Sequence, residues 1–333
     1  MRKGHTAMKQ FLVLIAAITA ATTSPHVVKP HSNVRSLVIL YTSSARGQIR
    51  TCNCTKFRFG GYGRESTLVK SLRSTNQDVL LLEGGDLTGG DNFQARLKTD
   101  VAAQALKLAG YNALTPGEED IGPAAGQAMK RFKSGPVPII CANLHTTGDT
   151  KPIYAPYVIV ETKNHLKVGV IGLMDKSVGG SLLEKGSGLT VGDPLAALKS
   201  ALPALRKKSS LTIVVFHGAP DDAEKLASVK DIDLILCTHR SDRDIVFPDK
   251  TKDSNEVGVP VGKTGGVVVV KSGTASNWSL GRLDISLTAQ GRIGDVKHTL
   301  LYLDRRYPED PKMVKIYEDY SKKVTAAVLA ASK

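Results

Sequence analysis

The sequence predicts an α/β fold built as one large domain. Short apolar runs, bounded by glycine and proline, alternate with stretches whose apolar residues recur at helical spacing. The chain has 333 residues, of which 41% are hydrophobic, and this is enough for one large core. Polar blocks close several of the apolar runs, at the strand ends where an α/β fold gathers its catalytic loops.

The apolar runs predict the strands. Because most of them are short and continuous, they are typical of strands covered on both faces. Strands are expected at residues 36–42, 79–82, 138–141, 157–161, 167–173, 211–216 and 234–237. Three later runs are expected to form a closing antiparallel set, at residues 267–270, 280–287 and 296–303.

Helices are expected at residues 63–73 and 99–109, where apolar residues follow helical spacing. Asp193 and Pro194 predict the start of another helix, because an acidic cap followed by proline suits the first helical turn. The last segment, 310–331, is charged and amphipathic. The organisation expected is a single domain at 36–305 followed by a C-terminal helix at 306–333.

The N-terminus predicts export. Basic residues precede an apolar run at 11–21, and small residues follow it, as in a signal peptide, here placed at 1–24 and followed by a flexible lead-in at 25–35. The run is shorter than the roughly 18 to 20 residues of a membrane span, although an uncleaved anchor is the alternative. We therefore expect a periplasmic or secreted protein without a transmembrane span in its mature chain.

The net charge favours an anionic ligand. The formal charge is +14, whereas aromatic residues make up only 5% and are not interleaved with basic ones. Nucleic acid is therefore not expected as a partner. The charge favours another anionic ligand or surface, and a solvated basic surface is the alternative; a small phosphorylated ligand is implied only by the family resemblance given below.

Four cysteines fall into two kinds. Cys141 and Cys237 end apolar runs and are expected to be small buried residues. Cys52 and Cys54 are separated by a single residue in a basic loop, so a disulfide between them would be strained and easily reduced. The basic residues nearby also lower the pKa of a thiol. Redox or ligand-binding chemistry, a structural clip, and two inert thiols all remain open for this pair.

Five polar blocks follow strands in a fixed order, at residues 42–47, 83–86, 117–120, 215–218 and 238–241. Together with glycine-containing landmarks at 60–64, 110–114 and 281–283, this series resembles the metallophosphoesterase (calcineurin-like) domain of the 5′-nucleotidase and nucleotide-sugar hydrolase family, over about residues 36–322. Some members carry a similar Cys-x-Cys and a Gly-Glu-x-Asp third block, so the resemblance extends to that degenerate subgroup. It implies two facing mixed β-sheets flanked by helices, in a four-layer sandwich.

The resemblance also implies two divalent metals that activate water and clamp a phosphoryl group across a bridging carboxylate. The family's first-metal ligands in Asp-x-His-Gly correspond to Ser44 and Arg46 here, and the second histidine of its Gly-His-x-His block corresponds to Ser241. Asp86 is then the only first-metal ligand left, so that site is expected to be empty.

The second-metal ligands are better retained. They correspond to Asp86, Glu118 in place of the family's asparagine, His217 and His239. Two imidazoles and two carboxylates suit one Zn²⁺, Mn²⁺ or Fe²⁺ ion. The alternative is no metal at all, with these residues satisfied by hydrogen bonds or by arginines. A shift of one position would place Glu119 in the cleft instead of Glu118.

The residues implied in catalysis are Glu119, Arg46 and Arg240. Glu119 aligns with the family's histidine that protonates the leaving group, and the two guanidinium groups match phosphate oxygens. The function expected is an exported family member with an eroded two-metal site and at most mononuclear hydrolysis of a phosphorylated substrate. The alternatives are a non-hydrolytic thiol protein acting through Cys52 and Cys54, and an anion-binding module.

Overall fold

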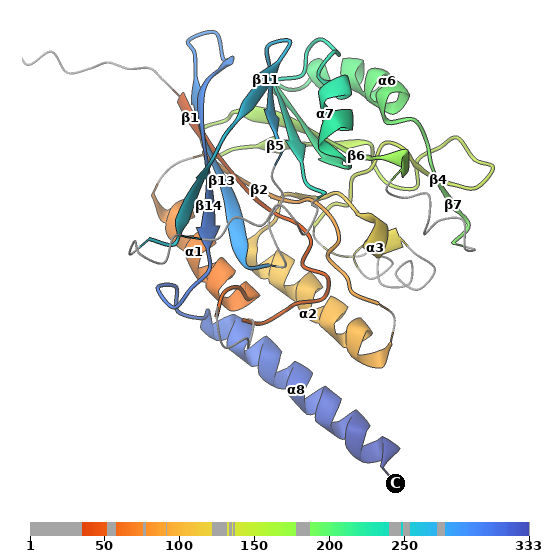
Figure 1. Ribbon diagram of the computed structural model, residues 1–333, viewed down its shortest axis with the longest axis vertical. Coiled ribbons are helices and arrows are strands. Elements are labelled where there is room, and N and C mark those ends of the chain that lie inside the picture. Colours follow the sequence, from red (N-terminus) through yellow and green to blue (C-terminus); the bar gives the residue numbers. More distant parts are fainter. Residues whose placement is uncertain are drawn as a thin grey trace, which may run out of the picture. The chain divides into compact units, whose positions relative to one another are not determined.

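The computed structural model describes residues 35–51, 58–75, 78–90, 92–121, 132, 135, 137–177, 187–239, 248, 254–271 and 277–332. These residues belong to one compact unit (Figure 1). The predicted signal peptide, nearly all of the lead-in, and Cys52, Cys54 and Arg240 lie outside the described residues.

The first sheet of the described chain has six strands in the order β10-β14-β13-β1-β2-β3. Strands β1, β2 and β3 are parallel, and β13, β14 and β10 continue the sheet in antiparallel pairs. Their bounds are Arg35–Thr42 for β1, Asp78–Glu83 for β2, Ala113–Leu114 for β3, Glu256–Val259 for β10, Ser279–Leu287 for β13 and Ile293–Tyr302 for β14.

The second sheet, also six-stranded among the described residues, has the order β11-β12-β9-β8-β6-β5. Its four inner strands are parallel, and an antiparallel strand closes each edge. The bounds are Tyr157–Glu161 for β5, Lys167–Met174 for β6, Leu211–His217 for β8, Leu234–Cys237 for β9, Gly262–Thr264 for β11 and Val267–Val270 for β12. A small two-stranded sheet pairs β4 (Leu144–Thr146) with β7 (Leu189–Val191).

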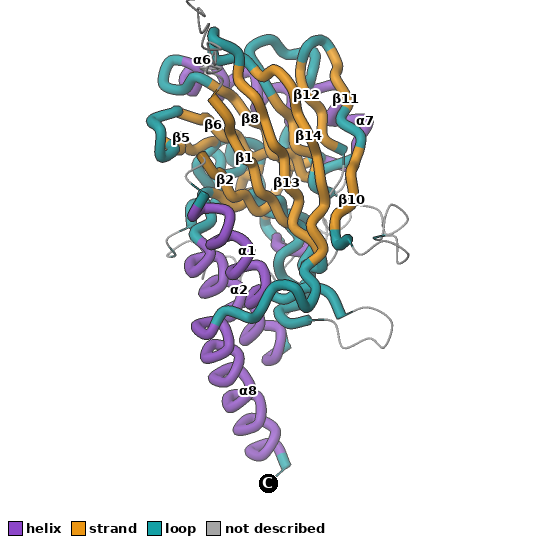
Figure 2. The backbone as a smooth tube through the Cα atoms, turned by 90° about the vertical axis from the view of Figure 1, so that its left-hand side faces the viewer, coloured by secondary structure: helices purple, strands orange, loops and turns teal. Residues whose placement is uncertain are grey.

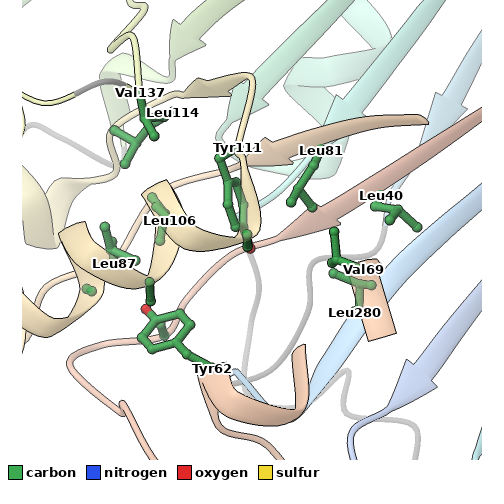
Figure 3. Packing of buried hydrophobic residues seen from close by; sticks show 14 of the residues in the cluster. Leu40, Tyr62, Val69, Leu81, Leu87, Leu106, Tyr111, Leu114, Val137 and Leu280 are labelled. Atoms are coloured by element: carbon green, nitrogen blue, oxygen red, sulfur yellow. The ribbon is translucent and has the colours of Figure 1, made fainter. Parts of the chain in front are cut away.

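Helices cover the outer faces of the two sheets. Helices α1 (Tyr62–Ser74) and α2 (Phe93–Ala109) pack beside the first sheet, and α8 (Pro311–Ala331) packs against these two helices (Figures 1 and 2). Helices α6 (Pro194–Arg206) and α7 (Pro220–Leu226) pack on the second sheet. Figure 3 shows part of the core under α1 and α2. Among the described residues, no helix is both long enough and apolar enough to cross a membrane.

The alternation of side chains along β1 explains how two layers of core form. Leu37, Ile39 and Tyr41 belong to the core between the sheets, and Val38 and Leu40 face the helices. Residues at alternate positions point to opposite faces, so a continuous apolar run supplies both layers. The predicted α/β fold, with two facing mixed sheets flanked by helices, is confirmed.

Three element predictions need correction. Residues 138–141 form isolated bridges rather than a strand, because the backbone crosses between the sheets: Ile140 N–H donates to Leu114 O, and Ala142 N–H donates to Gly172 O. Strand β12 joins the second sheet in parallel with β9, so it is not part of an antiparallel closing set. Helix α2 begins earlier than predicted, because Asn92 caps it by accepting from Ala95 N–H.

Candidate metal centre

The candidate site lies at the carboxyl ends of four strands, two from each sheet. Asp86 follows β2, Glu118 opens the short helix α3 (Glu118–Ile121) after β3, His217 ends β8, and His239 follows β9. Parallel strands bring their carboxyl ends to one edge of a sheet, so residues far apart in sequence converge here.

His217 is oriented from both of its ring nitrogens. It is fully buried, and its Nδ1 donates a hydrogen bond to the carbonyl oxygen of Gly84 at 2.7 Å. This bond fixes the tautomer and turns Nε2 toward Glu118 Oε2, which lies 2.7 Å away. A histidine held in this way by a backbone carbonyl is typical of a metal ligand.

Glu118 joins the two histidines. Its second oxygen, Oε1, lies 3.2 Å from Nε2 of His239. One ligand atom from each of Glu118, His217 and His239 lies within 4.8 Å of the others. Two imidazoles and a carboxylate are a donor set that fits Zn²⁺, Mn²⁺ or Fe²⁺.

Asp86 lies directly beside this group and is fully buried. Its Oδ1 accepts from the Glu119 backbone N–H at 3.1 Å and lies 3.6 Å from His217 Nε2. Its Oδ2 is buried and has no hydrogen-bond partner. A buried carboxylate oxygen without a hydrogen bond is costly unless a cation lies beside it, and the Arg46 guanidinium lies 3.6 Å from Oδ2. The other oxygen, Oδ1, faces His217, so Asp86 also fits a metal site beside the histidines.

Close approach of two loops requires glycine at position 117. A β-carbon there would collide with Asp86 Oδ1 and with Cε1 of His217. The absence of a side chain at this position therefore allows the Asp86 loop and the Glu118 loop to meet across His217.

The charges of the site stabilise one another. Burial disfavours a charged His217, but Asp86 and the hydrogen bond to Glu118 outweigh this effect and raise the pKa of His217 to about 9. Burial also disfavours ionised Glu118, yet its hydrogen bonds with both histidines hold its pKa well below the usual range. Without a metal, the pair is an imidazolium bound to a carboxylate.

Arg46 and Ser44 lie where the resemblance places the first metal. The Arg46 guanidinium is 3.6 Å from Asp86 Oδ2, and Ser44 Oγ is buried without a hydrogen-bond partner. Both residues adopt positive φ, 45° for Arg46 and 57° for Ser44, as does Asp86 at 56°. Three such residues outside glycine mark a strained loop pair, which is common at functional sites.

The structure brings Asp86, Glu118, His217 and His239 together, with Arg46 at the edge. The side chain of Glu119 is exposed, so the acid that meets the histidines is Glu118. Partial burial and the Asp86 carboxylate raise the pKa of Glu119. Arg240, Cys52 and Cys54 lie outside the described residues, and their roles stay predictions, as does the Cys-x-Cys subgroup.

Sequence reasoning gave Asp120 little weight, but this residue holds the Glu118 loop. It is fully buried and accepts hydrogen bonds from Thr88 N–H and Gly117 N–H, both at 2.9 Å. Burial and the nearby Asp86 raise its pKa to about 6, against the lowering effect of those hydrogen bonds. Its position inside a polar block after a strand was the available signal, although aspartate is also common at helix starts.

The expected burial of Cys141 and Cys237 is confirmed. Both are fully buried free thiols, and burial raises the pKa of each to about 12. They are therefore inert packing residues at neutral pH.

Comparison with known proteins gives a consistent result. The chain is 23% identical over 309 residues to a human (Homo sapiens) 5′-nucleotidase, a match that covers 86% of this chain and 53% of that protein. The chain spans about half the length of the curated relatives that it matches most broadly. No protein-family model matches the chain.

Two solved structures share the fold. A 5′-nucleotidase precursor from Thermus thermophilus has a TM-score of 0.70 and 21% identity, over 87% of this chain and 59% of that chain. The calcineurin-like phosphoesterase YfkN from Bacillus subtilis has a TM-score of 0.69 and 20% identity, over 89% of this chain and 99% of that chain. In its sequence relatives and in its fold, the chain is therefore similar to the 5′-nucleotidase-like metallophosphoesterases.

Proposed function

We propose that this protein is an exported metallophosphoesterase with one divalent metal site, acting on a small phosphorylated substrate. The observation that carries the proposal is the convergence of Glu118, His217 and His239, whose ligand atoms lie within 4.8 Å of one another. Buried Asp86 supports it, because its Oδ1 lies 3.6 Å from His217 Nε2, directly beside this donor set.

The ligands of the proposed metal are Asp86, Glu118, His217 and His239. A divalent ion held there supplies Lewis acidity toward a phosphoryl oxygen and toward water. Ser44 and Arg46 provide no such ligand pair for a second metal, and the cationic Arg46 compensates part of the charge of Asp86 instead. The two-metal centre of the family is therefore reduced to one ion plus one guanidinium.

The remaining steps belong to the protein's own side chains. The Arg46 side chain is 39% exposed, so its guanidinium reaches solvent and binds phosphate oxygens while its other side faces Asp86. Glu119 lies at the rim and is proposed as the proton donor to the leaving oxygen; partial burial and the Asp86 carboxylate raise its pKa, in the direction that this role requires. Arg240 is proposed as a second phosphate ligand from the sequence alone.

Metal binding is the first test. The chelator-stripped protein is titrated with Zn²⁺ and with Mn²⁺, and about one equivalent is expected to bind. His239→Ala and Asp86→Ala should lose this binding. His165→Ala is the matched control, because His165 is a solvent-exposed histidine with an 86% exposed side chain. Absence of bound metal in the wild type would contradict the proposal.

Hydrolysis is tested with an aryl phosphate ester. We expect metal-dependent turnover that Asp86→Ala abolishes and that Cys52→Ser/Cys54→Ser leaves unchanged. Thiol exchange that depends on the cysteine pair, without hydrolysis, would instead establish the thiol protein. Phosphate binding that needs Arg46 but neither metal nor turnover would establish the anion-binding module.

A further inference from the structure

A chain of four buried polar side chains runs from helix α1 to the strand end that precedes Asp86. Its members are Glu65, Tyr111, Thr42 and Glu83, none of them more than 5% exposed. The Tyr111 hydroxyl lies 2.6 Å from Glu65 Oε1 and 2.6 Å from Thr42 Oγ1. Thr42 Oγ1 lies 2.5 Å from Glu83 Oε2. Three short oxygen–oxygen contacts thus connect two carboxyl groups.

The number of protons available to these four side chains shows that one of the two carboxyl groups is protonated. Each contact lies at hydrogen-bond distance and requires one proton between its two oxygens. A hydroxyl group carries one proton and an ionised carboxylate carries none. Tyr111 and Thr42 therefore supply two protons for three contacts, and the third must come from Glu65 or Glu83. At least one of the two glutamates is protonated.

The surroundings favour the same conclusion. Within the described part of the chain, the ion pairs include neither Glu65 nor Glu83. The titratable groups that face them are acidic or phenolic: Asp120 of α3, Tyr62 of α1, Tyr111, and Tyr317 of α8. Burial raises the pKa of Glu83 to about 8 and that of Glu65 to about 7.

We propose that Glu65 and Glu83 share one acidic proton through Tyr111 and Thr42, and that this chain positions the loop that carries Asp86. With the proton on Glu83, Glu83 donates to Thr42, Thr42 to Tyr111, and Tyr111 to Glu65. With the proton on Glu65, all three hydrogen bonds reverse. The two forms have equal numbers of protons and the same single negative charge, so they interconvert without any other reactant.

The Glu83 end of the chain holds both sides of the turn before Asp86. Glu83 Oε1 accepts from the Gly85 N–H at 3.2 Å, and the Thr42 carbonyl accepts from the Gly84 N–H at 2.8 Å. Ser44 N–H in turn donates to the Gly85 carbonyl at 2.7 Å. Glu83 and Thr42 therefore fix the backbone that leads to the strained Asp86, and act as positioning residues.

Infrared spectroscopy tests the shared proton directly. Near neutral pH, the wild type is expected to show the carbonyl absorption of a protonated, buried carboxyl group. In Glu83→Gln, the amide oxygen keeps the Gly85 bond, so its nitrogen donates to Thr42 and supplies the third proton. Glu65 should then be ionised, and the absorption should be lost.

The double variant Glu83→Gln/Tyr111→Phe completes this test. Breaking the chain leaves Glu65 buried without a donor, so Glu65 should take up a proton and the absorption should return. The proposal is overturned if the wild type lacks the absorption, since neither glutamate would then be protonated. It is also overturned if Glu83→Gln retains the absorption, since Glu65 would then hold a proton of its own. A double variant that still lacks the carbonyl absorption would also overturn the proposal, because the proton of the wild type would then belong to Glu83 alone.

The pH dependence of unfolding is a second measurement that does not need the double variant. A shared proton held above the ordinary glutamate pKa of 4.5 contributes stability that is fully present below that pH and is lost as pH rises through about 8. The free energy of unfolding of Glu83→Gln should therefore fall less steeply over this range. An identical slope in both proteins would contradict the proposal.

The positioning role of Glu83 rests on the proposed metal site and is tested separately, by Zn²⁺ binding. Glu83→Ala should weaken Zn²⁺ binding by about tenfold or more, as expected for loss of a residue that supports a ligand. Glu83→Gln should restore binding, because it keeps the acceptor for Gly85 N–H. Equal binding in both variants would overturn the positioning role. If the wild type binds no metal, the infrared result still decides the shared proton.

Discussion

His217 Nε2 lies 2.7 Å from Oε2 of Glu118, and the other nitrogen of this histidine is held by the Gly84 carbonyl. The family resemblance places an asparagine at the position of Glu118. With a neutral amide at this position, Asp86 would be the only carboxylate beside His217. The Glu118 carboxylate adds a second negative charge, so that His217 becomes the cation of a buried ion pair. The site thus has an internal proton that any metal must displace.

This proton predicts the pH dependence of metal binding. Because Asp86 and Glu118 raise the pKa of His217 to about 9, Zn²⁺ must displace one proton at neutral pH. The association constant should therefore rise about tenfold per pH unit until about pH 9. Isothermal titration calorimetry in buffers of different ionisation enthalpy measures the released proton.

Glu118→Gln is the matched variant for that measurement. Its amide removes the negative charge that favours protonated His217, so the rise of the Zn²⁺ association constant with pH should level off at a lower pH. The same pH profile in both proteins would show that Glu118 does not control this proton.

Gly117→Ala should damage the site by packing alone. The added β-carbon would collide with Asp86 Oδ1 and His217, so the two loops must separate. We expect a loss of about 1–3 kcal/mol in the free energy of unfolding, together with a loss of metal binding. Gly258→Ala is the control, because a β-carbon there meets nothing within 4 Å. Equal effects of the two changes, measured by urea unfolding, would argue against the packing explanation.

Restoring the family's first-metal ligands should add a metal ion. The variant Ser44→Asp/Arg46→His/Ser241→His provides the residues that the resemblance places there, next to the carboxylate of Asp86. We expect elemental analysis to rise from about one to about two equivalents of Zn²⁺. Arg35→His/Ser36→Asp, at the exposed start of β1, is a control that should not change the metal content. An unchanged content in the triple variant would mean that more than these ligands has been lost.

Tyr317 attaches helix α8 to the rest of the molecule. Its hydroxyl donates to the Ile49 carbonyl at 2.7 Å and accepts from Gly63 N–H at 3.1 Å. Tyr317→Phe leaves the Gly63 N–H unpaired at a buried position, whereas the Ile49 carbonyl keeps its bond from Tyr62 N–H at 3.3 Å. The change should cost about 1–3 kcal/mol in urea unfolding. Tyr320→Phe removes only an exposed contact with Gln94, so its effect should stay within about 0.5 kcal/mol.

Local sequence pattern was enough to predict most of the strands and the strand ends at which the site forms. The continuous apolar runs at β1, β2, β8 and β9 indicated covered strands, and in the structure each of them is buried along most of its length. Polar residues after such strands, in the family's order, indicated Asp86, His217 and His239. The strands needed only local pattern, whereas these site residues were implied by the resemblance to the family.

Sheet membership and the close contacts were decided by the tertiary structure. The run at β12 pairs with β9 in parallel because the second sheet offers an edge there, and apolar composition does not distinguish one edge from another. Glu118 and Glu119 are adjacent acids, and only the backbone of α3 determines which one turns toward the histidines. Tyr111 and Thr42 likewise connect Glu65 and Glu83, which are 18 positions apart in the sequence. Only the fixed distances between these buried groups show that two hydroxyl protons serve three contacts, which is the basis of the proposed shared proton.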